Sequence, residues 1–146
     1  MACTGPEARQ FDFWIGEWEC TWEGGGRGSN SVRAVLDGCV IEEQFDARPT
    51  GDLRGMSLSI YSPVLGRWRQ TWVDNDGNYF DLVGGMEDGR MILACDETGT
   101  TARLRMVFSN VEQDSFDWQW ERSEGSGRTW KPLWQIRYRR KADQAS

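Results

Sequence analysis

Turns rich in glycine, aspartate and asparagine divide the chain into short runs in which polar and apolar residues alternate. Alternation with a period of two is typical of half-buried β-strands, and a sequence such as Asp37-Gly38 favours a tight hairpin. No segment between these turns has both the 3.6-residue period and the length of an amphipathic helix. We therefore predict about ten strands, over residues 17–23, 30–36, 39–47, 55–61, 67–73, 79–83, 90–96, 101–109, 115–122 and 128–140.

The shortness of the turns decides how these strands pair. Sequence neighbours joined by short turns pair antiparallel, so the strands form a meander, and closure of the meander removes the exposed edges of an open sheet. The predicted fold is an all-β, antiparallel up-and-down β-barrel of about ten strands, with a short helical turn over residues 10–15 that covers one end of the core. A two-sheet sandwich is the alternative. Pro132 interrupts the last strand, where we expect an edge or a bulge.

A chain of 146 residues suits one domain. We expect a flexible N-terminal arm over residues 1–9, a barrel domain over residues 10–141 and a C-terminal tail over residues 142–146. The absence of a long apolar run and of a secretory signal pattern favours a cytoplasmic protein without a membrane partner. Because that compartment is reducing, we expect free thiols at Cys3, Cys20, Cys39 and Cys95. Of these, Cys20, Cys39 and Cys95 are expected to be small buried hydrophobic side chains.

Two features of the composition exclude classes of function. The chain contains no histidine, which excludes a Ser-His-Asp or Cys-His arrangement, an imidazole zinc site and a haem held by a proximal histidine. The net charge of −6 disfavours nucleic-acid binding. We therefore expect no metal, no cofactor and no nucleic-acid partner.

The first strand begins with the motif Asp12-Phe13-Trp14-Ile15-Gly16-Glu17-Trp18. Its Gly-x-Trp segment, behind a short aromatic turn, resembles the signature of the lipocalin and calycin superfamily. The resemblance implies a cup-shaped barrel, like that of the ten-stranded fatty-acid-binding proteins, for small and mostly apolar ligands. In lipocalins a basic residue near the end of the last strand packs across the signature tryptophan. If the last strand closes antiparallel on the first, Arg140 takes this position, and Gly16, Trp18 and Arg140 form the closure.

A longer resemblance, to a family of small bacterial proteins of unknown function, covers nearly the whole chain. It rests on residues 12–18, 36–39, 67–74 and 118–122. That family is taken to have a lipocalin-like barrel, and the resemblance implies neither an activity nor a role for any residue. Nitrobindin-type haem barrels begin with a similar sequence, but their haem requires a histidine that this chain lacks.

The chain has nine tryptophans, which indicates either a heavily aromatic core or an aromatic-lined cavity. Strand parity selects the side chains that point inward. The predicted ligand-binding set is Trp22, Glu43, Phe45, Trp68, Gln70, Trp72, Trp118, Trp120 and Tyr138. Along the strand at residues 55–61, Met56, Leu58 and Ile60 share one face.

Glu43 is the most informative member of this set. It lies between Ile41 and Phe45 at two-residue spacing, so its carboxylate points into the barrel unless a bulge reverses the parity. A buried carboxylate must find a hydrogen-bond donor or become neutral, which makes it either a ligand anchor or part of an internal ion pair. Gln70 lies between Trp68 and Trp72 at the same spacing, so its amide is also expected to point into the barrel.

Three hypotheses about function follow. The first is a non-enzymatic barrel that binds a small hydrophobic or aromatic molecule, with the sealed end at the termini and the mouth at the opposite rim. The second is an enzyme of isomerase or cyclase type that uses Glu43 with Tyr61 or Tyr138 for proton transfer. The third is a homodimer that buries an outer strand face. No residue is assigned a catalytic role.

Overall fold

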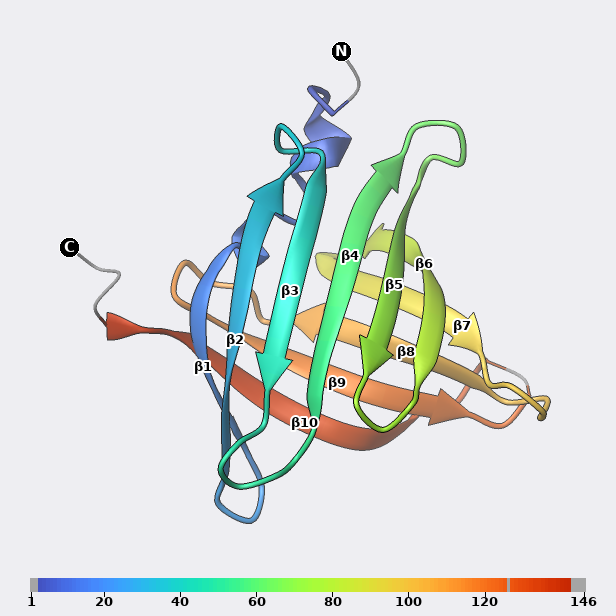
Figure 1. Cartoon of the computed structure of the whole chain (residues 1–146). Coiled ribbons are helices and arrows are strands. Elements are labelled where there is room, and N and C mark those ends of the chain that lie inside the picture. Colours follow the sequence, from blue (N-terminus) through green and yellow to red (C-terminus); the bar gives the residue numbers. More distant parts are fainter. Residues whose placement is uncertain (1–2, 126, 143–146) are drawn as a thin grey trace.

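The computed structural model describes residues 3–125 and 127–142. Within these ranges the chain forms a closed antiparallel barrel in sequence order, with β1 paired to β10 (Figure 1). The predicted up-and-down barrel is therefore confirmed. The elements are η1 (Pro6–Arg9), η2 (Asp12–Trp14), β1 (Gly16–Trp22), β2 (Gly26–Val35), β3 (Val40–Asp46), β4 (Arg54–Ser62), β5 (Arg67–Asp74), β6 (Tyr79–Glu87), β7 (Arg90–Asp96), β8 (Arg103–Ser109), β9 (Ser115–Ser123) and β10 (Lys131–Arg140).

Some strands extend into segments that the sequence pattern assigned to loops. β2 begins at Gly26 rather than at residue 30, because Gly26 pairs with Trp22 and leaves room for the indole ring; a Cβ there would lie 1.8 Å from the ring nitrogen. β6 continues through Gly84 and pairs there with β7. The irregularity predicted at Pro132 is present as a register shift between Pro132 and Trp134.

Closure brings the start of β1 and the end of β10 together at one rim. Trp18 and Arg140 lie opposite each other in the β1–β10 ladder, and the Arg140 guanidinium lies 4.3 Å from the centre of the Trp18 ring. Arg140 also donates to the carbonyl of Ile15 at 2.8 Å, while the Trp18 indole donates to the carbonyl of Trp14 at 2.8 Å. Gly16 starts the strand with a φ of 143°, a value that favours glycine.

The helical turns η1 and η2 cover this rim (Figure 1). Phe11 and Trp14 are fully buried, and their rings stack with centroids 4.9 Å apart. Phe11 also meets the ring of Phe108 edge to face at 5.0 Å. This end of the barrel is thus filled by a packed aromatic core. No helix in the described ranges is long and apolar enough to cross a membrane.

The N-terminal arm is attached to the barrel, which corrects one expectation about the cysteines. Cys3 and Cys39 form a disulfide with their Cα atoms 5.1 Å apart, so the prediction of free thiols is wrong for this pair. The two residues are 36 positions apart and meet only because η1, with Ala8 buried, folds the arm back onto the β2–β3 turn. Of the predicted arm and tail, residues 1–2 and 143–146 lie outside the described residues. The free cysteines of the described ranges are Cys20 and Cys95.

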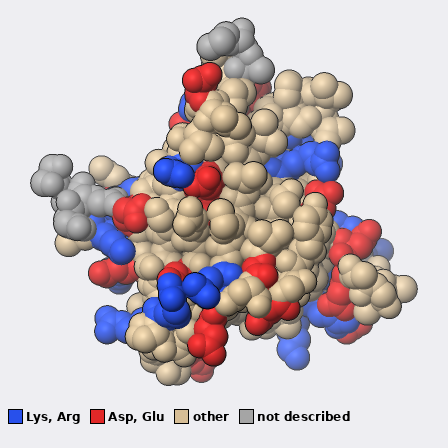
Figure 2. Space-filling view, in the orientation of Figure 1, with Lys and Arg blue, Asp and Glu red and all other residues tan. Residues whose placement is uncertain are grey.

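β4 carries its apolar residues on the outside of the barrel. Met56, Leu58 and Ile60 do share a face, but that face meets solvent, and the Leu58 side chain is 51% exposed. The inward positions are held by the buried Ser57 and Ser59. Figure 2 shows uncharged side chains over much of this side of the molecule, with charged ones gathered mainly around its margins.

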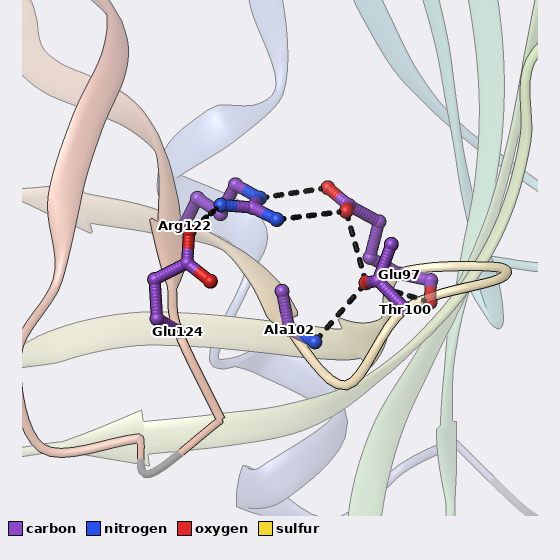
Figure 3. Close-up of polar contacts among 5 residues, drawn as sticks. All are labelled: Glu97, Thr100, Ala102, Arg122 and Glu124. Atoms are coloured by element: carbon purple, nitrogen blue, oxygen red, sulfur yellow. Dashed lines mark hydrogen bonds and ion pairs between the residues drawn. The ribbon is translucent and has the colours of Figure 1, made fainter.

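Charged side chains hold the β7–β8 turn at the rim opposite η1 and η2, which we call the far rim. Arg122 of β9 binds both carboxylate oxygens of Glu97 in the β7–β8 turn, at 3.0 and 3.1 Å, and also pairs with Glu124 (Figure 3). Thr100 donates to Glu97 at 3.0 Å and accepts from the backbone nitrogen of Ala102 at 3.1 Å. The hydrogen bonds from Arg122 and Thr100 lower the pKa of the Glu97 carboxyl. The β7–β8 turn of the far rim is therefore fixed to β9.

The closure makes a prediction about stability. Arg140→Ala removes the guanidinium from the Trp18 ring and from the Ile15 carbonyl, which should lower the free energy of unfolding by about 1–3 kcal/mol. Urea denaturation measures the difference. Arg139→Ala, at the neighbouring exposed position, is the control and should change stability by less than about 0.5 kcal/mol. Equal effects of the two substitutions would contradict a specific closing contact.

Candidate functional site

A cavity of about 170 Å³ lies between the β9–β10 wall and strands β3 to β6. It runs from the inner surface of the η2 plug to the β3–β4 and β5–β6 turns of the far rim. The side chains around it are mostly aromatic and apolar. They are Trp14, Glu43, Phe45, Leu53, Trp72, Asp74, Asn78, Phe80, Met106, Trp118, Trp120, Trp134, Ile136 and Tyr138.

Most of the inward residues selected from strand parity meet at this cavity, although some do not. Those that line it are Glu43, Phe45, Trp72, Trp118, Trp120 and Tyr138. The structure places the other three, Trp22, Trp68 and Gln70, elsewhere in the interior. Parity identifies the face of a strand, and position along the barrel axis decides which inward residues reach the cavity.

The three remaining residues contribute to packing. Trp68 is 1% exposed, lies edge to face on Phe11 at 5.2 Å and belongs to the plugged end. Gln70 is also 1% exposed and donates to the hydroxyl of Ser59 at 2.9 Å. Trp22 packs its ring against other aromatic side chains near the far rim. The ligand-binding role predicted for Trp68, Gln70 and Trp22 therefore has no support from this cavity.

Several cavity residues were missed in the sequence. Trp134 and Ile136 share the inward parity of Tyr138 along β10, so the alternation that selected Tyr138 was also a signal for them. The sequence identified Asp74 and Asn78 only as part of a turn. Nothing in it indicates that a turn residue lies at the cavity. Loop residues of the far rim are therefore the hardest part of this site to predict.

Glu43 points into the barrel, and no bulge turns it outward. It is 6% exposed and accepts from the Ser57 hydroxyl at 2.6 Å and from the Asn30 amide at 2.7 Å. Burial raises the pKa of the Glu43 carboxyl from 4.5 to about 7, although both hydrogen bonds oppose that rise. The carboxyl therefore changes its charge close to neutral pH, a property suited to anchoring a ligand or exchanging a proton with it.

The groups beside Glu43 are neutral at physiological pH. The Asn30 amide also donates to the Tyr138 hydroxyl at 2.9 Å, and that hydroxyl is hydrogen-bonded to the Cys20 thiol. Burial raises the pKa of both Tyr138 and Cys20 well above their ordinary values. Of the two tyrosines considered as partners of Glu43, Tyr138 shares the cavity, whereas Tyr61 lies against the ring of Trp68 outside it.

Asp74 places a second carboxylate at the far rim. It accepts from the Trp72 indole at 2.8 Å and from the backbone of Asp76 and Asn78 at 2.9 and 3.1 Å. Partial burial raises the pKa of Asp74, but the hydrogen bonds from Trp72 and Asn78 outweigh this effect and bring it below the ordinary value. Trp72 can lie across β4 because residue 55 is Gly55, where a Cβ would lie 2.2 Å from the indole ring.

The cavity is acidic and aromatic. Among the side chains that line it within the described ranges, two are carboxylates and none is a lysine or arginine. In the same part of the chain, no three Cys, Asp or Glu side chains gather closely enough to hold a metal ion. Its chemistry is therefore that of aromatic surface and hydrogen bonding, with one carboxyl that titrates near pH 7.

Comparison of the sequence with protein-family models gave no match, and comparison with curated protein sequences gave none either. The likeness to lipocalins and to a bacterial family thus stays a prediction from the motifs that carry it.

We predict that the stability of the protein depends on pH because Glu43 is buried. Because its pKa is raised on folding, the unfolded chain releases this proton first, and wild-type stability falls as the pH rises from 4.5 to about 7. Glu43→Gln removes the titration and keeps the shape of the side chain. The free energy of unfolding of the variant relative to wild type should therefore rise over that interval, by about 3 kcal/mol at most.

Urea denaturation at pH 5 and pH 8 measures this change. Glu42→Gln is the control, since Glu42 lies on the same strand but pairs with Arg33 on the outside of the barrel. The stability of this control variant relative to wild type should not rise with pH. A constant difference for Glu43→Gln would show that Glu43 keeps an ordinary pKa.

Proposed function

We propose that the barrel binds a small, largely apolar molecule of about the size of one aromatic ring inside the cavity. The supporting observation is the cavity itself, whose volume of about 170 Å³ is lined mainly by aromatic and apolar side chains. An apolar protein cavity of roughly 150 Å³ accommodates benzene, whereas sites for drug-sized ligands measure about 300–1,000 Å³. The volume therefore favours a single-ring molecule over a long-chain fatty acid.

The aromatic walls supply the affinity. Trp72, Phe80, Trp118, Trp120 and Trp134 are all half-buried, so each retains ring surface that a ligand covers. Removal of apolar surface from water contributes roughly 25 cal/mol per Å². The lipocalin-like opening motif agrees with such a role, because the resemblance implies a cup for small apolar ligands.

The cellular compartment is part of this proposal. The sequence pattern favours a cytoplasmic location, whereas a disulfide such as Cys3–Cys39 is typical of oxidising compartments.

Ligand binding is tested by isothermal titration calorimetry with benzyl alcohol. We expect saturable binding to a single site, and Trp120→Ala should weaken it about tenfold because the ring lines the cavity. Trp130→Ala is the matched control, since that ring lies on the outside beneath Arg105. No saturation with benzyl alcohol or with probes of the same shape and different charge, or tighter binding of oleate, would refute the proposal.

A second candidate function, self-association, rests on the outer face of β4 and its neighbours. Exposed apolar side chains there are Met56, Leu58, Ile60, Val73 and Tyr79. Contiguous exposed apolar patches mark interaction sites, and a second copy of the chain is the partner we propose. Sedimentation velocity at micromolar concentration should then give a dimer that Leu58→Arg converts to a monomer. A wild-type monomer at that concentration would exclude this role.

A further inference from the structure

The cavity contains negative charge without a positive counterpart. Glu43 lies in its wall and Asp74 at its rim, and neither carboxylate forms an ion pair within the described part of the chain. On the outside of the barrel, by contrast, several carboxylates are paired with arginine, as Asp81 is with Arg69 at 3.1 Å. Charge inside the barrel is therefore left for a ligand to balance.

The side chains between the two carboxylates favour the same kind of ligand. Faces of tryptophan and phenylalanine rings carry negative electrostatic potential and attract organic cations. The rings of Trp72, Phe80, Trp120 and Trp134 enclose the cavity, and carboxylates that flank aromatic faces strengthen the attraction for an ammonium group. An anionic ligand would meet repulsion from Asp74, and from Glu43 once that carboxyl is ionised, so the cavity selects against it.

We propose that the ligand of this cavity is an organic ammonium, an amine that carries an apolar body of about one aromatic ring. This inference rests on the proposed binding function and adds the charge of the ligand. The apolar body packs against the tryptophan rings, and the ammonium group is attracted by the carboxylates of Asp74 at the rim and Glu43 in the wall. Asp74 is oriented for this by hydrogen bonds from the Trp72 indole and the Asn78 backbone, at 2.8 and 3.1 Å.

The protonation state of Glu43 should make ligand affinity depend on pH. The groups facing it are the neutral donors Asn30 and Ser57, the neutral Tyr138 and Cys20, and across the cavity the carboxylate Asp74. None of these brings a positive charge, so an ammonium ion stabilises the ionised form of Glu43. Since the pKa of the free carboxyl is about 7, affinity should rise up to about tenfold between pH 6 and pH 8.

Three probes of one shape and different charge test the inference. Benzylamine, which is protonated from pH 6 to pH 8, is compared with benzyl alcohol and benzoate by calorimetry on the full chain. We expect benzylamine to bind at least tenfold more tightly than benzyl alcohol, and benzoate to bind most weakly. The advantage of benzylamine should increase from pH 6 to pH 8.

Charge-neutralising variants locate the effect. Asp74→Asn and Glu43→Gln should each reduce the preference for benzylamine over benzyl alcohol about tenfold, and only Glu43→Gln should abolish its dependence on pH. Asp81→Asn is the control, because it removes the same charge from the outer surface and leaves the cavity unchanged. If all three variants lose the preference for benzylamine equally, that preference arises from the net negative charge of the chain and not from the cavity. This result would overturn the inference.

The outcomes separate this inference from the function on which it rests. If benzyl alcohol or benzoate binds as tightly as benzylamine, the charge preference is refuted while the binding function stands. If none of the three probes saturates the protein, both proposals fall. The wild-type comparison needs no substitution, so it decides the question even if a variant fails to fold.

Discussion

The antiparallel pairing of β1 with β10 is the contact on which the rest of the structure depends. Without it the meander would be an open sheet with two unpaired edges and an interior open along its length. Trp18 and Arg140 lie opposite each other in this ladder, and Arg140 also binds the carbonyl of Ile15 just before β1. One arginine thus joins the last strand, the first strand and the turn that plugs the barrel.

The plug divides the interior into two regions. Around Phe11 and Phe108 the rings pack against one another and leave no room for a ligand. Toward the far rim Trp120 and Trp134 stand around a cavity of about 170 Å³. The many aromatic residues therefore serve as both core and cavity wall, and the sequence offered these two as alternatives.

The inner wall also has a polar side that works against stability. Glu43 and Ser57 face each other across the β3–β4 ladder, and Ser59 and Gln70 do the same across β4–β5. Burial of these groups has a cost that hydrogen bonds only partly offset, while Leu58 and its outward neighbours leave apolar surface in solvent. Positions that oppose stability in this way are typical of sites kept for binding.

The sequence by itself predicted the existence of the strands, their antiparallel order and the meeting of Arg140 with Trp18, and it favoured an inward Glu43 while leaving a bulge open. These follow from a period of two and from short turns, which are local rules. Tertiary structure alone decided that the outward face of β4 is the apolar one, that Cys3 bonds to Cys39 and that Asp74 joins the cavity. Alternation distinguishes the two faces of a strand, but depth in the barrel and contacts between distant segments depend on how the whole chain packs.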